Sequence, residues 1–132
     1  MVALMAATDV AVHLYWNGRV KTKKYDVVYE GGDMNVMPIK LNYGTTYAGL
    51  LDKIYATTGI KGKDFELNII CRYPISSREY KPIPIKNDEA VDLMLEVPCR
   101  SFRVYCVEIY LEATRCVKSL LRESAQMSES EC

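Results

Sequence analysis

The sequence lacks the features that mark membrane, secreted and disulfide-rich proteins. No apolar run approaches the roughly 20 residues needed to span a bilayer, and the opening "MVALMAATDV" has neither the basic start nor the length of a secretory signal. The five cysteines include no C-x-x-C pair, and no N-x-S/T glycosylation acceptor occurs. These absences predict an intracellular protein with reduced thiols and no membrane partner.

The sequence also lacks the residue patterns of catalytic sites, zinc sites and phosphate-binding loops. His13 is the only histidine, and strand alternation puts it on the face opposite the core, whereas Cys71 is expected to point inward. Cys99, Cys106 and Cys116 match no zinc-site spacing. The stretch "YEGGDM" lacks the lysine and the glycine spacing of a phosphate-binding loop. We therefore predict no catalytic residues, no metal, no cofactor and no small-molecule substrate.

Length and composition fit one small domain. Hydrophobic residues make up 49% of the 132 residues, which is enough for a single core. Lys plus Arg and Asp plus Glu both number 17, so the net charge is zero, unlike that of a dedicated nucleic-acid binder. The charges are unevenly placed, because residues 13–86 hold twelve Lys/Arg against seven Asp/Glu and residues 87–132 hold five against nine. Such asymmetry suits docking to a charged partner, the alternative being solvated surface on each element.

Alternating apolar residues predict strands in the first third of the chain. Val10–Trp16 alternates, and Asn17-Gly18 after it is a strong hairpin signal that would pair it with the basic stretch 19–29. Gly31-Gly32 indicates a turn. Asn35–Leu41 is the next predicted strand, and its inward-facing residues are expected to be Met37, Ile39 and Leu41.

A predicted helix and two more strands follow. Thr45 or Thr46 can cap a helix that ends at Gly59, with apolar residues at helical spacing. Phe65–Tyr73 alternates as a strand, and Pro74–Glu79 is read as a turn. The stretch "KPIPIK" is predicted to be a short edge strand, because proline lacks the N–H that an inner strand needs. Its inward-facing residues would be Ile83 and Ile85.

The last third contains a second predicted helix and a final strand. Asn87 or Asp88 can cap "DEAVDLMLEV", a helix that Pro98 is expected to end. Arg103–Glu112 is the last predicted strand, and Ala113–Ala125 has the spacing of a further helix. We expect a flexible N-terminus over residues 1–9, one domain over 10–112 and a C-terminal helix or tail over 113–132.

The predicted order is strand, strand, helix, strand, strand, helix, strand. A hairpin followed by a helix that crosses a mixed sheet is the ubiquitin-like β-grasp arrangement, so we predict an α+β fold of that type. The alternative is a ferredoxin-like split βαβ sheet, which uses a similar set of elements.

Two stretches resemble a known family. Tyr29–Ile54, "YEGGDMNVMPIKLNYGTTYAGLLDKI", looks like part of a β-grasp interaction domain of the Phox/Bem type. With "YKPIPIKNDEAVDLML" added, the chain resembles more closely the Phox/Bem-like domain at the amino terminus of plant Mutator-like transposases. In that domain an acidic turn opens a helix of the D-x-x-V-x-x-M kind, here Asp88, Val91 and Met94. The likeness covers Val10 to Glu112.

The resemblance implies a non-catalytic protein–protein interaction module. Its partner would be another protein or a second copy, giving a homo-oligomer, bound through charged faces or a strand edge, and residence would be nuclear or cytoplasmic, nuclear only by this likeness. Phox/Bem-type domains carry an acidic loop where residues 74–86 here hold Glu79 as their only acid, so the classical front-to-back polymerisation through that loop is not expected. The candidate partner-binding residues are Arg19, Lys21, Lys23, Lys24 and Lys40 on a basic face, and Asp88, Glu89 and Asp92 on an acidic one.

Two alternatives concern the same charged residues. The stretch "RVKTKK" could contact phosphates, which would make the protein a nucleic-acid-binding accessory domain of a transposase-derived protein. Asp88, Glu89 and Asp92 could serve only to stabilise the first turn of their own helix, at the positive end of its dipole.

Overall fold

The computed structural model describes residues 9–100 and 106–116. The elements follow in the order β1 (Asp9–Trp16), β2 (Arg19–Thr22), β3 (Val27–Glu30), β4 (Asn35–Asn42), α1 (Tyr47–Thr58), β5 (Phe65–Ser76), β6 (Glu79–Pro84), α2 (Asp88–Leu95), α3 (Val97–Arg100) and β7 (Val107–Arg115). Within these residues, no helix combines the length and the apolar character required to span a bilayer.

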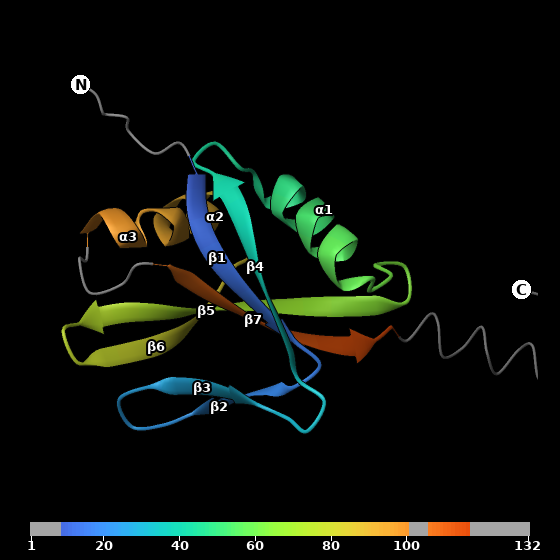
Figure 1. Ribbon diagram of the computed structural model, residues 1–132, viewed down its shortest axis with the longest axis horizontal. Helices are drawn as coiled ribbons and strands as arrows, with labels where there is room; N and C mark the ends of the chain where they lie inside the picture. Colours follow the sequence, from blue (N-terminus) through green and yellow to red (C-terminus); the bar gives the residue numbers. More distant parts are fainter. Residues whose placement is uncertain (1–8, 101–105, 117–132) are drawn as a thin grey trace, which may run out of the picture.

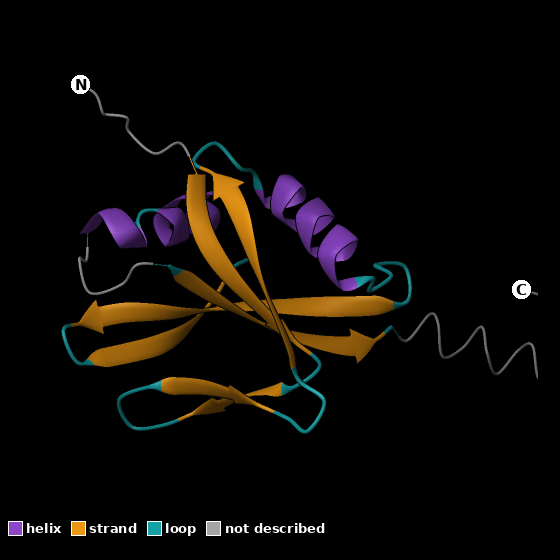
Figure 2. Cartoon of the chain, in the orientation of Figure 1, coloured by secondary structure: helices purple, strands orange, loops and turns teal. Residues whose placement is uncertain are grey.

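A mixed five-stranded sheet forms the centre of the molecule. Its strands lie in the order β4-β1-β7-β5-β6, with β1 and β7 parallel and the other neighbours antiparallel. The helices cover one face of this sheet, and the two-stranded β2–β3 hairpin covers the other (Figures 1 and 2). The predicted α+β fold with a mixed sheet is therefore confirmed.

Both longer helices begin where the sequence predicts. The Thr46 side chain accepts a hydrogen bond from the Gly49 N–H at 3.0 Å, and Gly59, with a φ of 77°, ends α1 in the left-handed conformation. The Asn87 side chain likewise accepts from the Ala90 N–H at 2.8 Å at the start of α2. The prediction that Pro98 ends α2 is wrong, because α2 ends at Leu95 and Pro98 lies in the first turn of α3, where its missing N–H is tolerated.

The main core lies between the helices and the sheet. Inward-facing residues of β1 and β7 alternate as predicted, and they pack with buried residues of both helices. The fully buried members of this core include Val12, Leu14, Leu50, Ile54, Cys71, Val91, Met94 and Ile109. The burial of these side chains supplies the hydrophobic stabilisation of the fold.

The predicted hairpin between the first two strands does not form. Asn17 adopts a φ of 70°, which suits a turn, but β2 pairs with β3 and not with β1. The reason is that β1 is an inner strand whose two edges are already taken by β4 and β7, so it has no edge left for β2. After Asn17 the chain therefore leaves the sheet and returns through the β2–β3 hairpin before β4 begins.

The hairpin buries a tyrosine cluster on the second face of the sheet. Tyr110 is only 3% exposed and stacks on Tyr29, with ring centroids 5.3 Å apart, while Tyr15 packs edge-on against Tyr110 at 5.2 Å. The hairpin therefore covers this face of the sheet, and Tyr110 is buried beneath it.

The edges of the sheet account for the remaining differences. β6 is an edge strand, as its prolines predict. Met37 on β4 and Ile83 on β6 were expected to face inward, but they are 45% and 36% exposed and lie outside the core cluster, which holds Ile39 and Leu41 of β4.

Two strands run further than the sequence predicts. β5 continues through the predicted turn to Ser76 by way of a bulge after Pro74. Residues 113–115, where a helix or tail was expected to begin, continue β7 and pair with β5. The rest of that predicted segment, residues 117–125, lies outside the described part of the chain.

Candidate functional site

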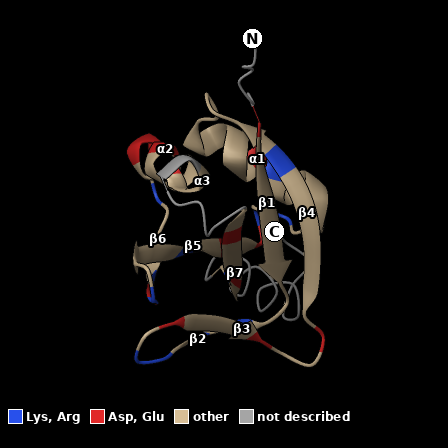
Figure 3. Cartoon of the chain, turned by 60° about the vertical axis from the view of Figure 1, so that its left-hand side comes forward, with Lys and Arg blue, Asp and Glu red and all other residues tan. Residues whose placement is uncertain are grey.

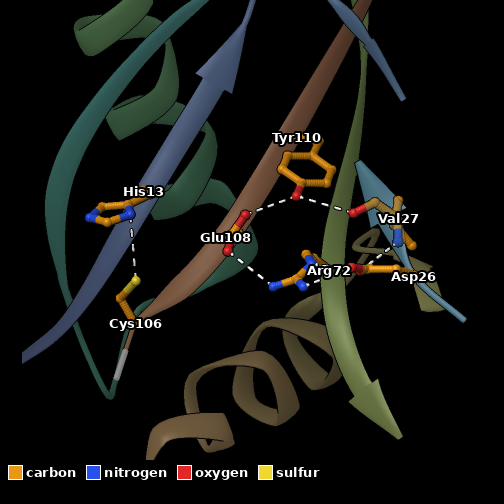
Figure 4. Close-up of polar contacts among 7 residues, drawn as sticks. All are labelled: His13, Asp26, Val27, Arg72, Cys106, Glu108 and Tyr110. Carbon is orange, nitrogen blue, oxygen red and sulfur yellow. Dashed lines mark hydrogen bonds and ion pairs between the residues drawn. The ribbon is translucent and has the colours of Figure 1, made fainter. Parts of the chain in front are cut away.

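Arg72 lies at the centre of a polar network between the sheet and the hairpin. Its Nε and Nη2 donate to the two carboxylate oxygens of Asp26 at 2.8 and 3.1 Å, and its Nη1 donates to Glu108 Oε2 at 3.2 Å (Figure 4). The Tyr110 hydroxyl donates to the other Glu108 oxygen at 2.8 Å. The guanidinium also lies over the Tyr80 ring, 3.7 Å from its centroid.

This network is suited to holding the hairpin and not to acid–base chemistry. The hydrogen bond from Arg72 lowers the pKa of Asp26, and the same pair raises the pKa of Arg72. Burial and the Glu108 carboxylate raise the pKa of the Tyr110 hydroxyl, so that it remains a hydrogen-bond donor. Near neutral pH, Asp26 therefore stays deprotonated, Arg72 stays protonated and Tyr110 stays neutral.

His13 and Cys106 form the one His–Cys contact among the described residues. The His13 Nδ1 and the Cys106 Sγ lie 3.5 Å apart (Figure 4). Burial, followed by the nearby Glu108, raises the pKa of the Cys106 thiol, which disfavours the thiolate that a nucleophile would need. Cys71 is buried as predicted, and its pKa is raised to about 12 by burial.

The sequence could not reveal the His13–Cys106 contact, because it depends on the parallel pairing of β1 with β7. In that pairing His13 lies opposite Glu108, two residues after Cys106. The described part of the chain contains no group of three or more His, Cys, Asp or Glu placed to hold a metal ion.

The predicted basic residues separate into two places. Arg19, Lys21, Lys23 and Lys24 are exposed on the β2–β3 hairpin. Lys21 approaches Glu30 at 3.9 Å, but both side chains are more than half exposed, so this pair contributes little stability. Lys40 is exposed near the C-terminal end of β4, whereas the hairpin precedes the start of that strand.

The predicted acidic residues lie together on α2, but they differ in their contacts. The Asp88 carboxylate accepts a hydrogen bond from the Tyr47 N–H at 2.7 Å, so it caps the first turn of α1. Glu89 and Asp92 are exposed, and Leu93 beside them is 45% exposed. The acidic surface available to a partner is therefore centred on Glu89, Asp92 and Leu93.

The two charged groups lie on opposite faces of the molecule. The β2–β3 hairpin packs against the tyrosine face of the sheet, whereas α2 packs against the other face. Figure 3 shows the basic tip of the hairpin at one end and the acidic first turn of α2 at the other. A partner that presents one charged surface could therefore bind only one of these two groups at a time.

An open groove that the sequence did not predict lies at the base of the hairpin. It has a volume of about 450 Å³ and lies where the base of the hairpin meets the ends of β5 and β7. Its apolar lining includes Trp16, Ile60, Phe65 and Ala113, and Arg19, Glu30 and Asp33 contribute charged groups. The groove combines residues from five separate parts of the chain, which explains why no local pattern revealed it.

Comparison of the chain with protein-family models, with curated proteins and with solved structures found no match.

Proposed function

We propose that this chain is a non-catalytic protein–protein interaction module with a ubiquitin-like β-grasp fold, of the Phox/Bem-like kind that the sequence resembles. The fold assignment is supported by the strand order. β1 and β4 form an antiparallel pair, α1 then crosses the sheet to β5, and the final strand β7 lies parallel to β1 at the centre. The parallel central pair favours this arrangement over the split βαβ alternative.

The separation of charge carries the functional proposal. The exposed cations of the hairpin and the exposed acids of α2 lie on opposite faces of one sheet. Complementary charged faces steer association and set orientation, and Leu93 supplies an exposed apolar contact within the acidic surface. The partner of each face is therefore a protein surface of opposite charge, which a second copy of this chain itself contains.

Strand addition is the less favoured mode of binding. Both edge strands carry proline, Pro38 in β4 and Pro82 and Pro84 in β6. An added strand would meet an incomplete row of backbone donors at either edge. The charged faces are therefore the surfaces that we expect to bind.

Light scattering of the purified protein at low and high salt tests this proposal. We expect a mass above that of the monomer at low salt that falls toward the monomer as salt screens the charges. The variants K23E/K24E and E89K/D92K should each lose this self-association, and a mixture of the two should form a dimer through the one remaining pair of intact faces. Asp88 is left unchanged in both, because it caps α1.

The outcome of this experiment also separates self-association from binding to another protein. A monomer at both salt concentrations directs the search to a foreign partner, for which the same two variants serve as baits. Identical capture of proteins by the wild type and by both variants would contradict the proposal.

A further inference from the structure

The tip of the β2–β3 hairpin lies beside the start of β6, next to the turn that carries Arg78. The Tyr80 N–H donates to the Tyr25 carbonyl oxygen at 2.9 Å and so attaches the start of β6 to the tip. Arg78 lies in the turn two residues before Tyr80 and is exposed, and the sequence did not associate it with the hairpin. We call this surface the tip patch and define it as Lys21, Lys23, Lys24, Tyr25 and Arg78.

The tip patch keeps its positive charge because the nearest acid is engaged elsewhere. Asp26 directly follows Tyr25, but its two carboxylate oxygens accept from Arg72. The other nearby acids are each paired with a lysine: Glu30 approaches Lys21 at 3.9 Å, and Glu79, next to Arg78 in the sequence, pairs with Lys81 at 3.4 Å. Lys23, Lys24 and Arg78 are thus exposed cations, and Figure 3 shows the basic tip of the hairpin at one end of the molecule.

Hydrogen bonds also brace the backbone at the hairpin tip. The Lys23 N–H donates to the Asp26 carbonyl oxygen at 2.8 Å across the turn, and the Asp26 side chain is fixed by Arg72 below it. The cations and the ring of Tyr25 are therefore presented together on a fixed turn, which lowers the entropy lost when a ligand binds.

Tyr25 adds an exposed aromatic ring to the charges of the tip patch. Its ring is 56% exposed and has the Lys24 ammonium 5.2 Å from its centroid. The neighbouring Tyr80 ring is instead covered by Arg72. An exposed aromatic ring surrounded by cations matches the way single-stranded nucleic acid is bound, with phosphates on the cations and a base stacked on the ring. A duplex keeps its base faces stacked and could use only the cations.

We propose that the tip patch binds single-stranded nucleic acid, with phosphates contacting Lys21, Lys23, Lys24 and Arg78 and one base stacking on Tyr25. This activity goes beyond the proposed association with proteins and requires neither α2 nor self-association. Because the binding relies on charge and stacking, we expect little preference for sequence.

Fluorescence anisotropy with a labelled, unstructured oligo-dT of about 12 nucleotides tests the proposal. Three or four neutralised phosphates predict that affinity falls by about 20- to 50-fold between 50 and 200 mM salt. K23Q/K24Q and R78Q should each weaken binding. Tyr25→Leu should weaken it by about tenfold, whereas Tyr25→Phe should retain it because the ring remains.

Matched controls separate the patch from the general charge of the protein. Lys40 is also exposed, but it lies on β4 at the other edge of the sheet, so K40Q should leave binding unchanged. A duplex of the same length should bind the wild type and Tyr25→Leu equally. Circular dichroism should show that all variants are folded, since each changed side chain is exposed.

Three results would overturn the proposal. The first is no anisotropy change at 50 mM salt. The second is equal weakening by K40Q and R78Q, which would mean that binding depends only on net charge. The third is full retention of oligo-dT binding by Tyr25→Leu together with equal competition by polyglutamate, which would identify an acidic protein surface as the ligand.

Discussion

Arg72 on β5 and Asp26 on the β2–β3 hairpin form a two-point ion pair, with N–O distances of 2.8 and 3.1 Å. The Arg72 side chain is 22% exposed, and the same guanidinium reaches Glu108 on β7. The Arg72 side chain therefore joins the hairpin to both β5 and β7 of the central sheet. Arg72 and Asp26 are 46 residues apart in the sequence.

Replacing Arg72 by methionine should destabilise the fold. The change leaves the Asp26 and Glu108 carboxylates near each other without a cation, and we expect a loss of about 2 kcal/mol in the free energy of unfolding. Urea denaturation measures this loss. The exposed Arg78→Met serves as the control and should change stability by less than about 0.5 kcal/mol. Equal effects of the two substitutions would mean that the ion pair does not hold the hairpin.

The same ion pair should make stability depend on acid pH. The hydrogen bond from Arg72 is the main reason that the pKa of folded Asp26 lies below its ordinary value of 3.8. The unfolded chain therefore takes up this proton first, so the stabilisation is complete above pH 3.8 and is lost as pH falls through the lower folded pKa.

Asp26→Asn isolates this contribution of one carboxylate. The difference in unfolding free energy between wild type and Asp26→Asn should be largest near neutral pH and should shrink in the acid range. Urea titrations from about pH 6 to pH 2 measure it. A difference that stays constant over this range would show that the Asp26 proton is not linked to folding.

Gly18 should not tolerate a side chain. A Cβ atom there would lie 2.6 Å from the Glu30 carbonyl oxygen and 2.7 Å from the Tyr29 ring. Gly18→Ala should therefore destabilise the protein by about 1–3 kcal/mol through overpacking. At Gly32 a Cβ would meet no atom within 4 Å, so Gly32→Ala is the matched control and should change the melting temperature little. A neutral Gly18→Ala would indicate that the hairpin base readily shifts.

Asp88 should affect stability more than binding. Asp88→Ala removes the acceptor of the Tyr47 N–H and should cost about 1 kcal/mol, the usual cost of losing a helix cap. Glu89→Ala, one residue away and exposed, should leave stability nearly unchanged. Thermal unfolding of both variants distinguishes the two roles. Equal melting temperatures would mean that the Asp88 cap does not stabilise the fold, and Asp88 would then count among the acidic residues available to a partner.

Local patterns in the sequence determined the elements of this fold. The cap at Thr46, the glycine at 59 and the cap at Asn87 set the helix boundaries, because capping involves residues within one turn of each other. The prolines of β6 likewise identified an edge strand, since a missing donor is a property of the residue itself.

Only the tertiary structure decided which elements meet. Asn17-Gly18 encodes a turn, but β1 had both edges occupied, so the predicted partner β2 paired with β3 instead and covered the tyrosine face. The tip patch and the Arg72 network likewise join residues from distant elements. Strand pairing depends on which edges are free once the core has formed, and that is a property of the whole chain which no local window contains.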